Sequence, residues 1–409
     1  MSFSWLPPGT LPAAHLVLTA RALRAFGDGF VSLLLPFYLT LLGYSALEVG
    51  VIITATLLGS GITTLVMGFV AHRYSGQALL LIGAGLMCLT GIALAFAQDF
   101  WPVFVVAFVG TLNPNASDAT LFSPLEHSLL SNTAPAQART ALFARYSVIG
   151  SLVMAIGAQA SALPHILAAQ TTLEPVAAIQ CMFALYAVLG AANFLIYRRL
   201  PRPQATQAAA GTSALGASRK NVYRLAALFS LDALGGGFVV QSLLALWLLQ
   251  RFDLSLIAAG SIFFWTGVLT AFSQLASPAV AARFGLVNTM VYTHVPANLF
   301  LILVPFMPTL PLAIGLLCLR SLLSSMDVPA RNSYVMAVVN PGERAAAASL
   351  TAVPRSLASA LSPALAGYLL GISGFGWPLV IAGTLKLTYD VLLLVMFKGV
   401  KPPEESREV

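Results

Sequence analysis

The chain has 409 residues, of which 58% are hydrophobic and only 9% are charged, and its mean hydropathy is +0.87. A soluble domain carries about 25% charged residues, so this composition excludes an ordinary soluble protein and indicates a chain embedded in a bilayer. The net charge of +7 comes from dispersed bases rather than a basic run, which argues against a nucleic-acid-binding surface.

Apolar runs of about 20 residues, the length that crosses the hydrocarbon core, recur along the chain. In chain order we expect spans at residues 15–42, 47–70, 78–97, 102–130, 140–163 and 176–197. After a hydrophilic stretch we expect further spans at 222–250, 254–278, 286–306, 311–339, 345–371 and 377–398. The predicted fold is therefore an all-α integral membrane protein with twelve transmembrane helices.

The hydrophilic stretch divides the spans into two groups of six. It is rich in Ala, Gly, Ser and Pro with bases at both ends, which is typical of a linker. We expect an N-terminal half at 1–197, a cytoplasmic linker at 198–221, and a C-terminal half with a short cytoplasmic tail at 222–409.

The basic residues of the loops and span ends predict the orientation. With the N-terminus inside, thirteen of them are cytoplasmic and one, Arg251, is external. An excess of Lys and Arg marks the cytoplasmic side of a membrane protein. We therefore expect a multi-pass protein of the cytoplasmic (inner) membrane with both termini in the cytoplasm.

Short motifs recur between the two halves at a nearly constant offset. FGDGFV at 26–31 is echoed by LGGGFV at 234–239, 208 residues later, and the loop at 68–75 by the loop at 278–285, 210 residues later. Asp118 is echoed by Asp327, 209 residues later. A shared offset and order predict two pseudo-symmetric halves related as parallel repeats.

This organisation resembles the major facilitator superfamily. The loop after the second span, with Gly68, Ala71 and Arg73, is similar to that family's G-x-L-A-D-R-x-G-R-K motif, although His72 stands where the family has aspartate. The resemblance implies a secondary active transporter that works by alternating access. It also implies that Gly68, His72, Arg73 and, in the second half, Arg283 are gating-loop residues. Signatures of the drug antiporters and sugar porters are absent, so no subfamily is assigned.

Ionisable side chains interrupt several spans. They are costly in a bilayer, so they usually pair or face a cavity, and they mark functional sites. They are seven bases and six acids: Arg21, Arg24, Arg145, Arg320, Arg331, Arg355 and Lys386, with Asp28, Asp118, Glu126, Asp232, Asp327 and Asp390. The near balance of sign indicates pairing.

Helical spacing predicts which of these charges meet. Arg24 and Asp28 share one face of the first span, and Asp327 and Arg331 one face of the tenth. Lys386 and Asp390 form an i, i+4 pair that we interpret as structural.

Two of the acids are candidates for carrying a proton. A buried carboxylate near an arginine can change its proton occupancy with access to water, and Asp28 and Asp118 are the first choices, with Glu126 next. The alternative is that these charges are static pairs that hold helices together. That alternative is favoured for Glu126 and His127, which approach the cytoplasmic end of their span.

The resemblance further implies that the first, fourth, seventh and tenth spans line a central cavity. The substrate-binding candidates on those spans, together with two neighbours on the fifth, are Arg24, Asn113, Asn115, Asp232, Gln241, Asp327 and Arg331, with Arg145 and Tyr146. Asn113-Pro114-Asn115 is interpreted as a helix kink, and Gly235–Gly237 as a site of close helix packing.

Metal, nucleotide and catalytic motifs are not apparent. The cysteines Cys88, Cys181 and Cys318 stand singly, and the histidines His15, His165 and His294 show no ligand spacing, so neither a metal site nor a cofactor is expected. No hydrolase motif or phosphate loop is found, so we expect neither an enzyme nor an ATP-driven pump.

The sequence thus predicts a proton-coupled transporter of a small molecule, acting as a monomer in the lipid bilayer. Export of a drug-like or amphipathic compound is favoured, because an apolar lining with isolated carboxylates suits such solutes. The alternative is an organic anion bound by Arg24, Arg145 and Arg331, since a guanidinium binds anions bidentately. A membrane sensor or enzyme that does not transport is a third, less favoured interpretation.

Overall fold

The computed structural model describes residues 6, 9–70, 73–114, 121–131, 133, 136–201, 218–339 and 343–398. Within those ranges the chain is helical and contains no strand. The helices before the linker are α1 (Ala13–Leu41), α2 (Ala46–Val70), α3 (Gly76–Phe96), α4 (Phe100–Val109), α5 (Phe122–Ser131), α6 (Ala136–Ala160), α7 (Leu163–Gln170) and α8 (Pro175–Arg198). Those after it are α9 (Arg219–Gly237), α10 (Gln241–Phe252), α11 (Leu256–Phe284), α12 (Leu286–Leu303), the 3-10 helix η1 (Val304–Phe306), α13 (Leu310–Ser324), α14 (Asp327–Ala337), α15 (Arg344–Ile372) and α16 (Trp377–Phe397).

Each of the twelve predicted spans is occupied by helix. In the described residues ten helical segments are long and apolar enough to cross a membrane by length and composition. The two predicted spans outside that set are the fourth, whose helix α4 is short and apolar, and the eleventh, which is α15.

Three of the predicted spans are built from two helices each: α4 with α5, α9 with α10, and α13 with α14. The predicted kink at Asn113-Pro114 is instead a break, because α4 already ends at Val109 and Gly110 is extended. The residue before a proline is disfavoured in helical conformation, which keeps Asn113 out of a continuous helix. Asn115 lies outside the described residues.

The other two breaks also follow from local sequence. Helix α9 ends in the glycines 235–237, and glycine is a poor helix former. Helix α14 begins at Asp327 with Pro329 in its first turn, where a missing backbone N–H is tolerated and an acidic side chain is favourable. Discontinuous membrane helices of this kind commonly carry binding sites in transporters.

Contacts divide the chain into two compact units. The first comprises Met1–Ser45, Ala55–Thr206 and Leu254–Phe264, and the second comprises Ala46–Thr54, Gln207–Asp253 and Trp265–Val409. The beginning of α2 thus packs with the second unit and the beginning of α11 with the first. The division of the chain at the linker remains a prediction.

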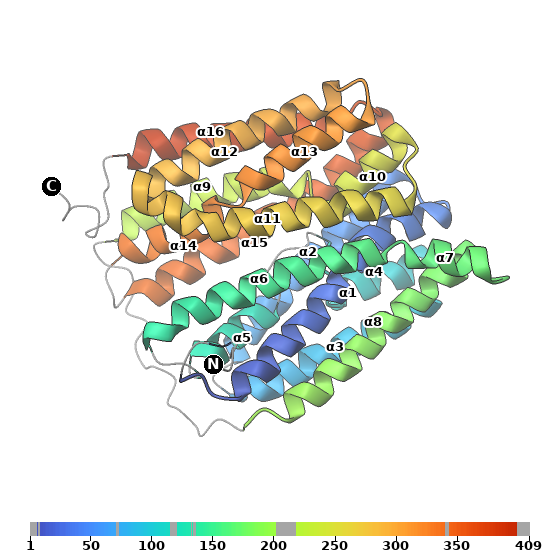
Figure 1. Ribbon diagram of the computed structural model, residues 1–409, viewed down its shortest axis with the longest axis horizontal. Helices are drawn as coiled ribbons and strands as arrows, with labels where there is room; N and C mark the ends of the chain where they lie inside the picture. Colours follow the sequence, from blue (N-terminus) through green and yellow to red (C-terminus); the bar gives the residue numbers. More distant parts are fainter. Residues whose placement is uncertain are drawn as a thin grey trace, which may run out of the picture. The chain divides into compact units, whose positions relative to one another are not determined.

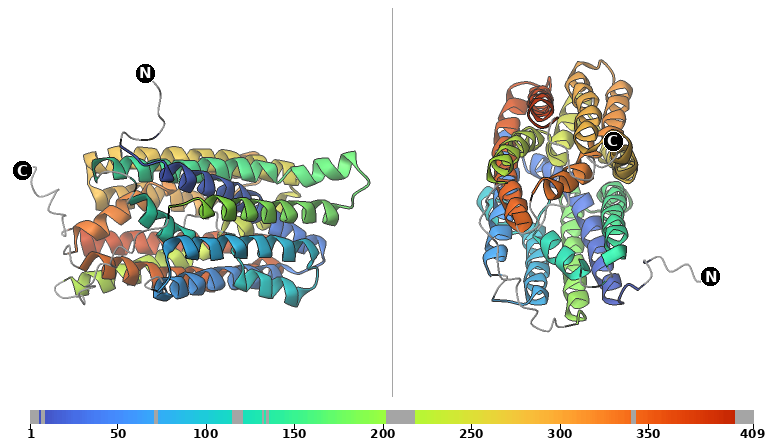
Figure 2. Two further views of the ribbon diagram at one scale, coloured as in Figure 1. Left: turned by 90° about the horizontal axis from the view of Figure 1, so that it is seen from below. Right: turned by 90° about the vertical axis from the view of Figure 1, so that its left-hand side faces the viewer.

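The first unit is organised around α1, which lies between α6 and α8 (Figures 1 and 2), while α3 packs along α8. Gly29 permits the close crossing of α1 and α6, because a Cβ atom there would collide with the carbonyl oxygen of Met154. Leu80, Leu142 and Tyr146 belong to the buried apolar core that joins these helices.

The second unit repeats this arrangement with α9 in the central place, against α15 and α16 (Figure 1). Gly237, 208 residues after Gly29, permits the crossing of α9 and α15, since a Cβ atom there would collide with the carbonyl oxygen of Ser359. The close packing predicted for the glycine run is therefore observed. Helix α12 packs against α13, α14 and α16, and Met290 and Val291 of this helix belong to the buried apolar core of the second unit.

Candidate functional site

Each unit buries one cluster of charged side chains. The first cluster consists of Arg24, Glu126, Tyr146 and Tyr197, from α1, α5, α6 and α8. Arg24 donates from both guanidinium amino groups to the two Glu126 oxygens, at 3.0 and 2.7 Å. Tyr197 donates to Oε1 at 2.7 Å and Tyr146 to Oε2.

The carboxylate at the centre of the first cluster is fully hydrogen-bonded, whereas Nε of Arg24 is buried without a partner among the described residues. Glu126 is fully buried and Arg24 is 1% exposed, and the two carboxylate oxygens accept four hydrogen bonds between them. The ring of Phe122 lies 4.3 Å from the guanidinium carbon of Arg24 and adds a cation–π contact. Spacing favoured Asp28 as the partner of Arg24. The structure pairs Arg24 with Glu126 instead, because that carboxylate offers the bidentate geometry that a guanidinium prefers.

Asp28 lies one turn further along α1 and is held more loosely. It accepts hydrogen bonds from Tyr186 at 3.4 Å and from Asn113 at 3.5 Å, both near the upper limit for such bonds. It is 1% exposed, and Arg21 and Arg24 act on it electrostatically without an ion pair to it among the described contacts. Asp28 is thus a buried carboxylate whose hydrogen-bond donors are neutral.

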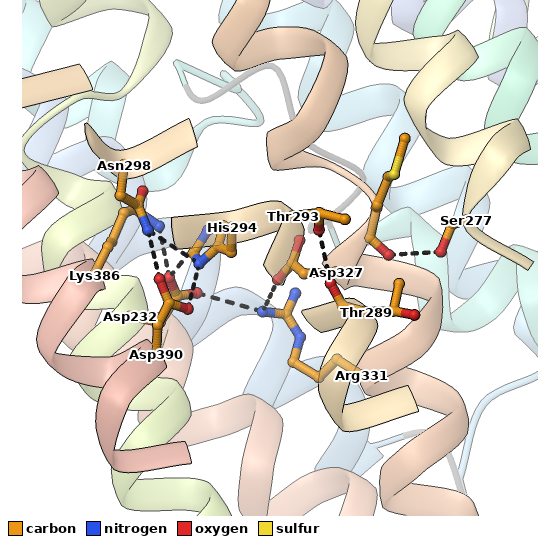
Figure 3. A network of polar contacts seen from close by, with 11 residues as sticks. Asp232, Ser277, Thr289, Thr293, His294, Asn298, Asp327, Arg331, Lys386 and Asp390 are labelled. Carbon is orange, nitrogen blue, oxygen red and sulfur yellow. Dashed lines mark hydrogen bonds and ion pairs between the residues drawn. The ribbon is translucent and has the colours of Figure 1, made fainter. Parts of the chain in front are cut away.

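The second cluster consists of Asp232, His294, Asn298, Asp327, Arg331, Lys386 and Asp390 (Figure 3). Asp232 on α9 is shared by two cations: Lys386 Nζ lies 2.6 Å from Oδ1, and Arg331 Nη1 lies 3.4 Å from Oδ2. Arg331 also contacts Asp327, four residues earlier on α14, at 3.1 Å. The contact predicted from the spacing of Asp327 and Arg331 is confirmed.

His294 on α12 joins this cluster to a third carboxylate. Its Nδ1 lies 2.8 Å from Oδ1 of Asp390, whose Oδ2 accepts from Asn298 at 2.9 Å (Figure 3). The predicted pair of Lys386 with Asp390 is not formed, because each finds its partner on another helix. From the sequence, His294 was considered only as a metal ligand, and no ligand spacing was found. Its i, i+4 spacing from Asn298 inside an apolar span could have indicated a buried polar contact.

Two further cations lie beside the second cluster. Arg320 on α13 and Arg355 on α15 both act electrostatically on Asp232. Neither makes an ion pair with another described residue, and Nε of Arg320 is buried without a hydrogen-bond partner. The described part of the second cluster therefore carries more positive than negative groups.

The remaining predicted site residues are dispersed. Tyr146 is in the first cluster, while Arg145 beside it is half-buried on α6 and its Nη1 has no hydrogen-bond partner there. Gln241 is half-buried at the start of α10, Gly68 lies in the last turns of α2, and Arg73 and Arg283 are exposed. Asp118 and His72 lie outside the described residues. In the described ranges no group of three or more His, Cys, Asp or Glu could hold a metal ion.

Comparisons with known proteins agree with this architecture. The sequence model of the Major Facilitator Superfamily matches residues 17–326. An uncharacterized membrane protein of Saccharomyces cerevisiae is 24% identical over 414 residues, which cover 92% of each chain.

Similar solved structures are those of transporters. The nucleoside transporter NupG has a TM-score of 0.71 at 15% identity and covers 95% of this chain and 100% of its own. The human organic anion transporter MFSD10 has a TM-score of 0.66 at 19% identity, with coverage of 94% and 100%. A bacterial homologue of the human lysosomal transporter Spinster has a TM-score of 0.65 at 15% identity, with coverage of 95% and 96%. The predicted twelve-helix fold is confirmed.

Proposed function

Because the chain belongs to the major facilitator superfamily, we propose that it is a proton-coupled secondary transporter whose substrate is an organic anion. The family and the fold indicate a membrane transporter of a small molecule rather than an enzyme. Substrate class and coupling are proposed from the buried charges.

The observation that carries the substrate class is a pair of half-buried arginines, Arg320 and Arg355, that lie beside the second cluster without an acidic partner among the described residues. The predicted spans hold seven bases and six acids. Asp118 lies outside the described residues, and the other five acids are Asp28, Glu126, Asp232, Asp327 and Asp390. Four of these acids contact Arg24, Lys386, Arg331 or His294 within 4.0 Å. Arg320 and Arg355 have no such partner among the described residues, so an anion would meet a compensating charge next to the second cluster.

This assignment reverses the order of the two substrate classes favoured by the sequence. Arg24 and Arg331, two of the three arginines suggested there, are engaged by acids. Among the described residues, no acid lies within ion-pair distance of Arg320 or Arg355. A carboxylate, phosphate or sulfonate group is the chemistry that a planar guanidinium binds best.

Asp28 is the proposed proton carrier of the first unit. Its neutral hydrogen-bond partners, Asn113 and Tyr186, can serve either the carboxylate or the carboxylic acid, because a tyrosine hydroxyl and an amide each donate and accept. Glu126 is a poorer candidate, since its two oxygens already accept four bonds, two of them from a guanidinium. Asp118 keeps its place among the candidates on sequence grounds alone.

Export of an amphipathic cation is the second candidate function. The supporting observation is again Asp28, which a cationic solute could approach without displacing an ion-paired arginine. A cation and a proton would then compete for one carboxylate, which is the arrangement required for exchange of the two.

We further propose that the protein is a monomer in the cytoplasmic membrane with both termini in the cytoplasm.

The test is the thermal stability of the purified protein against a library divided between lipophilic cations and organic anions, at about pH 5.5 and about pH 8. A ligand that binds the native state raises its apparent stability by mass action. Stabilisation by anions, stronger at the lower pH, supports the first proposal. Stabilisation by cations, stronger at the higher pH because a cation and a proton compete for Asp28, supports the second and excludes the first.

Matched variants assign the binding to residues. Arg355→Gln and Arg320→Gln should each weaken stabilisation by an anion about tenfold or more in concentration, since a hydrogen-bonded charge contributes roughly 1.5–3 kcal/mol. Arg251→Gln is the control, because Arg251 is an exposed arginine in the last turn of α10, outside the clusters. Equal anion binding by all three variants would remove the basis of the anion assignment.

A further inference from the structure

Resting on the anion transport proposed above, we infer that His294 is a second proton-binding group whose proton binds together with the anion. His294 would be a site of proton coupling in the second unit. Because the proton and the anion bind together, they would be transported in the same direction.

His294 stands between two carboxylates (Figure 3). Its Nδ1 is 2.8 Å from Oδ1 of Asp390, and its Nε2 is 4.0 Å from Oδ1 of Asp232. The histidine is 3% exposed and Asp390 is fully buried. Asn298 donates to the other oxygen of Asp390, and its Nδ2 also lies 3.2 Å from Nδ1 of the histidine, so the carboxylate and the amide together orient the ring.

This orientation leaves one ring nitrogen for an incoming proton. With Asp390 as acceptor, Nδ1 carries the proton of the neutral ring, and the lone pair of Nε2 faces Asp232. Uptake of a proton from water forms one new N–H bond, at Nε2, and gives an imidazolium with a carboxylate on each side. A charge-assisted hydrogen bond is about 2.7–2.9 Å long, so Asp232 and the ring would approach by roughly 1 Å.

The histidine belongs to a network of charged and titratable groups on five other helices. They are Lys386, Tyr389 and Asp390 from α16, Asp232 from α9, Asp327 and Arg331 from α14, Arg355 from α15 and Arg320 from α13. The four permanent cations exceed the three carboxylates while the histidine is neutral. A proton alone increases that excess and is disfavoured, whereas a proton with an anion leaves it unchanged.

Proton and anion binding are therefore mutually favourable, and such coupling is reciprocal. Asp232 is the element that links them. Of its two cation contacts, the one to Arg331, at 3.4 Å, is longer than the one to Lys386, at 2.6 Å. When the imidazolium draws Asp232 toward it, the contact with Arg331 is the one that lengthens, which frees guanidinium N–H groups for the anion.

The experiment follows the protonation of His294 directly by nuclear magnetic resonance of protein with carbon-13-labelled histidine. The chain has five histidines, and His294→Gln identifies the signal. We expect this ring to take up a proton as the pH is lowered, and to do so at a higher pH when benzoate is added as the probe anion. A ring that stays neutral throughout, or a midpoint that falls or does not move with benzoate, overturns the inference.

A binding measurement separates coupling from a merely structural role. Above the midpoint of His294, benzoate affinity measured by calorimetry should fall toward tenfold per pH unit, because one proton binds with each anion. His294→Gln should abolish this pH dependence, whereas loss of a purely structural contact would lower affinity equally at every pH. His165→Gln, at an exposed histidine of α7, is the control that should match the unaltered chain.

The two proposals fail in different ways. If no organic anion stabilises the protein, anion transport is wrong. If benzoate binds with an affinity that does not depend on pH, anion binding stands and the role of His294 is wrong.

Discussion

The two charged clusters occupy corresponding places in the two units but carry opposite charge at the centre. Arg24 on α1 and Asp232 on α9 are separated by 208 residues, the offset that also separates Gly29 from Gly237. Arg24 meets one acid and two tyrosine hydroxyls in a closed set. Asp232 is shared by Lys386 and Arg331 and faces His294 at 4.0 Å.

We interpret the first cluster as a structural ion pair and the second as a network of charges that can rearrange. In the first cluster, neither oxygen of Glu126 can gain a bond without losing one, so a change of protonation would break the pair. In the second, a proton or an anion can be accommodated by a shift of Asp232 between its two cations, Lys386 and Arg331, and the ring of His294. The repeat has therefore kept the packing of its helices while changing the polarity of the site that they enclose.

The largest expected effect is the loss of one partner from the closed pair. Arg24→Ala leaves Glu126 buried and without its cation, which costs about 3–5 kcal/mol when a buried pair is broken. We expect little folded protein, measured by size-exclusion chromatography and thermal unfolding. The double variant Arg24→Met with Glu126→Leu is the control, because replacement of both charges by apolar groups is often neutral. A double variant as unstable as the single one would show that the pair is not the cause.

The glycine crossings test whether the two units share their packing. Gly29→Ala and Gly237→Ala each place a methyl group against a backbone carbonyl, of Met154 and Ser359 respectively. Overpacking of this kind costs about 1–3 kcal/mol, and we expect the two variants to lose similar stability in thermal unfolding. Gly315→Ala on α13, where a Cβ atom would meet open space, should be close to neutral. A large difference between the first two would argue against equivalent crossings.

A smaller loss is expected when the shared carboxylate loses one of its cations. In Lys386→Met, Asp232 keeps its contact with Arg331 and remains near Arg355, so we expect a cost of about 1–2 kcal/mol rather than the full penalty of an unpaired charge. The comparison with Arg24→Ala, made in the same unfolding assay, measures how redundant the second cluster is. Equal losses in both variants would mean that the second cluster is as closed as the first.

The sequence predicted contacts between residues close together in the chain, but it did not predict contacts between residues far apart in the chain. Helical spacing identified the contact of Asp327 with Arg331, because residues four apart on a helix are neighbours whatever the fold. The same rule favoured Arg24 with Asp28 and Lys386 with Asp390, and both preferences were wrong. A buried ion selects the partner with the best geometry and desolvation, and for Arg24 and Lys386 that partner lies on another helix, 102 and 154 residues away. The contact of His294 with Asp390 was not predicted for the same reason, since the two residues are 96 positions apart in the chain.

The spans themselves were predicted within a few residues, because twenty apolar residues are required by the bilayer itself. The breaks between α9 and α10 and between α13 and α14 were not predicted, although each coincides with glycine or proline. In a membrane protein such residues are tolerated within helices, so their presence alone does not distinguish a kink from an interruption.

The smallest effect on stability, and the sharpest on transport, is expected at Asp28. Its contacts with Tyr186 and Asn113 are 3.4 and 3.5 Å long, so Asp28→Asn, which has nearly the same shape and no charge to bury, should change stability by less than about 1 kcal/mol. If Asp28 carries a proton, the variant can still bind substrate but cannot release the proton on the other side. Exchange of substrate between two sides at equal pH should then persist, while accumulation driven by a pH gradient in proteoliposomes is lost.

Ser32→Ala, one turn along α1 and equally buried, is the matched control and should retain both activities, because its hydroxyl accepts no proton in transport. Gradient-driven accumulation that survives in Asp28→Asn would transfer the coupling to Asp118 or to the His294 cluster, whereas unfolding of the variant would identify Asp28 as structural.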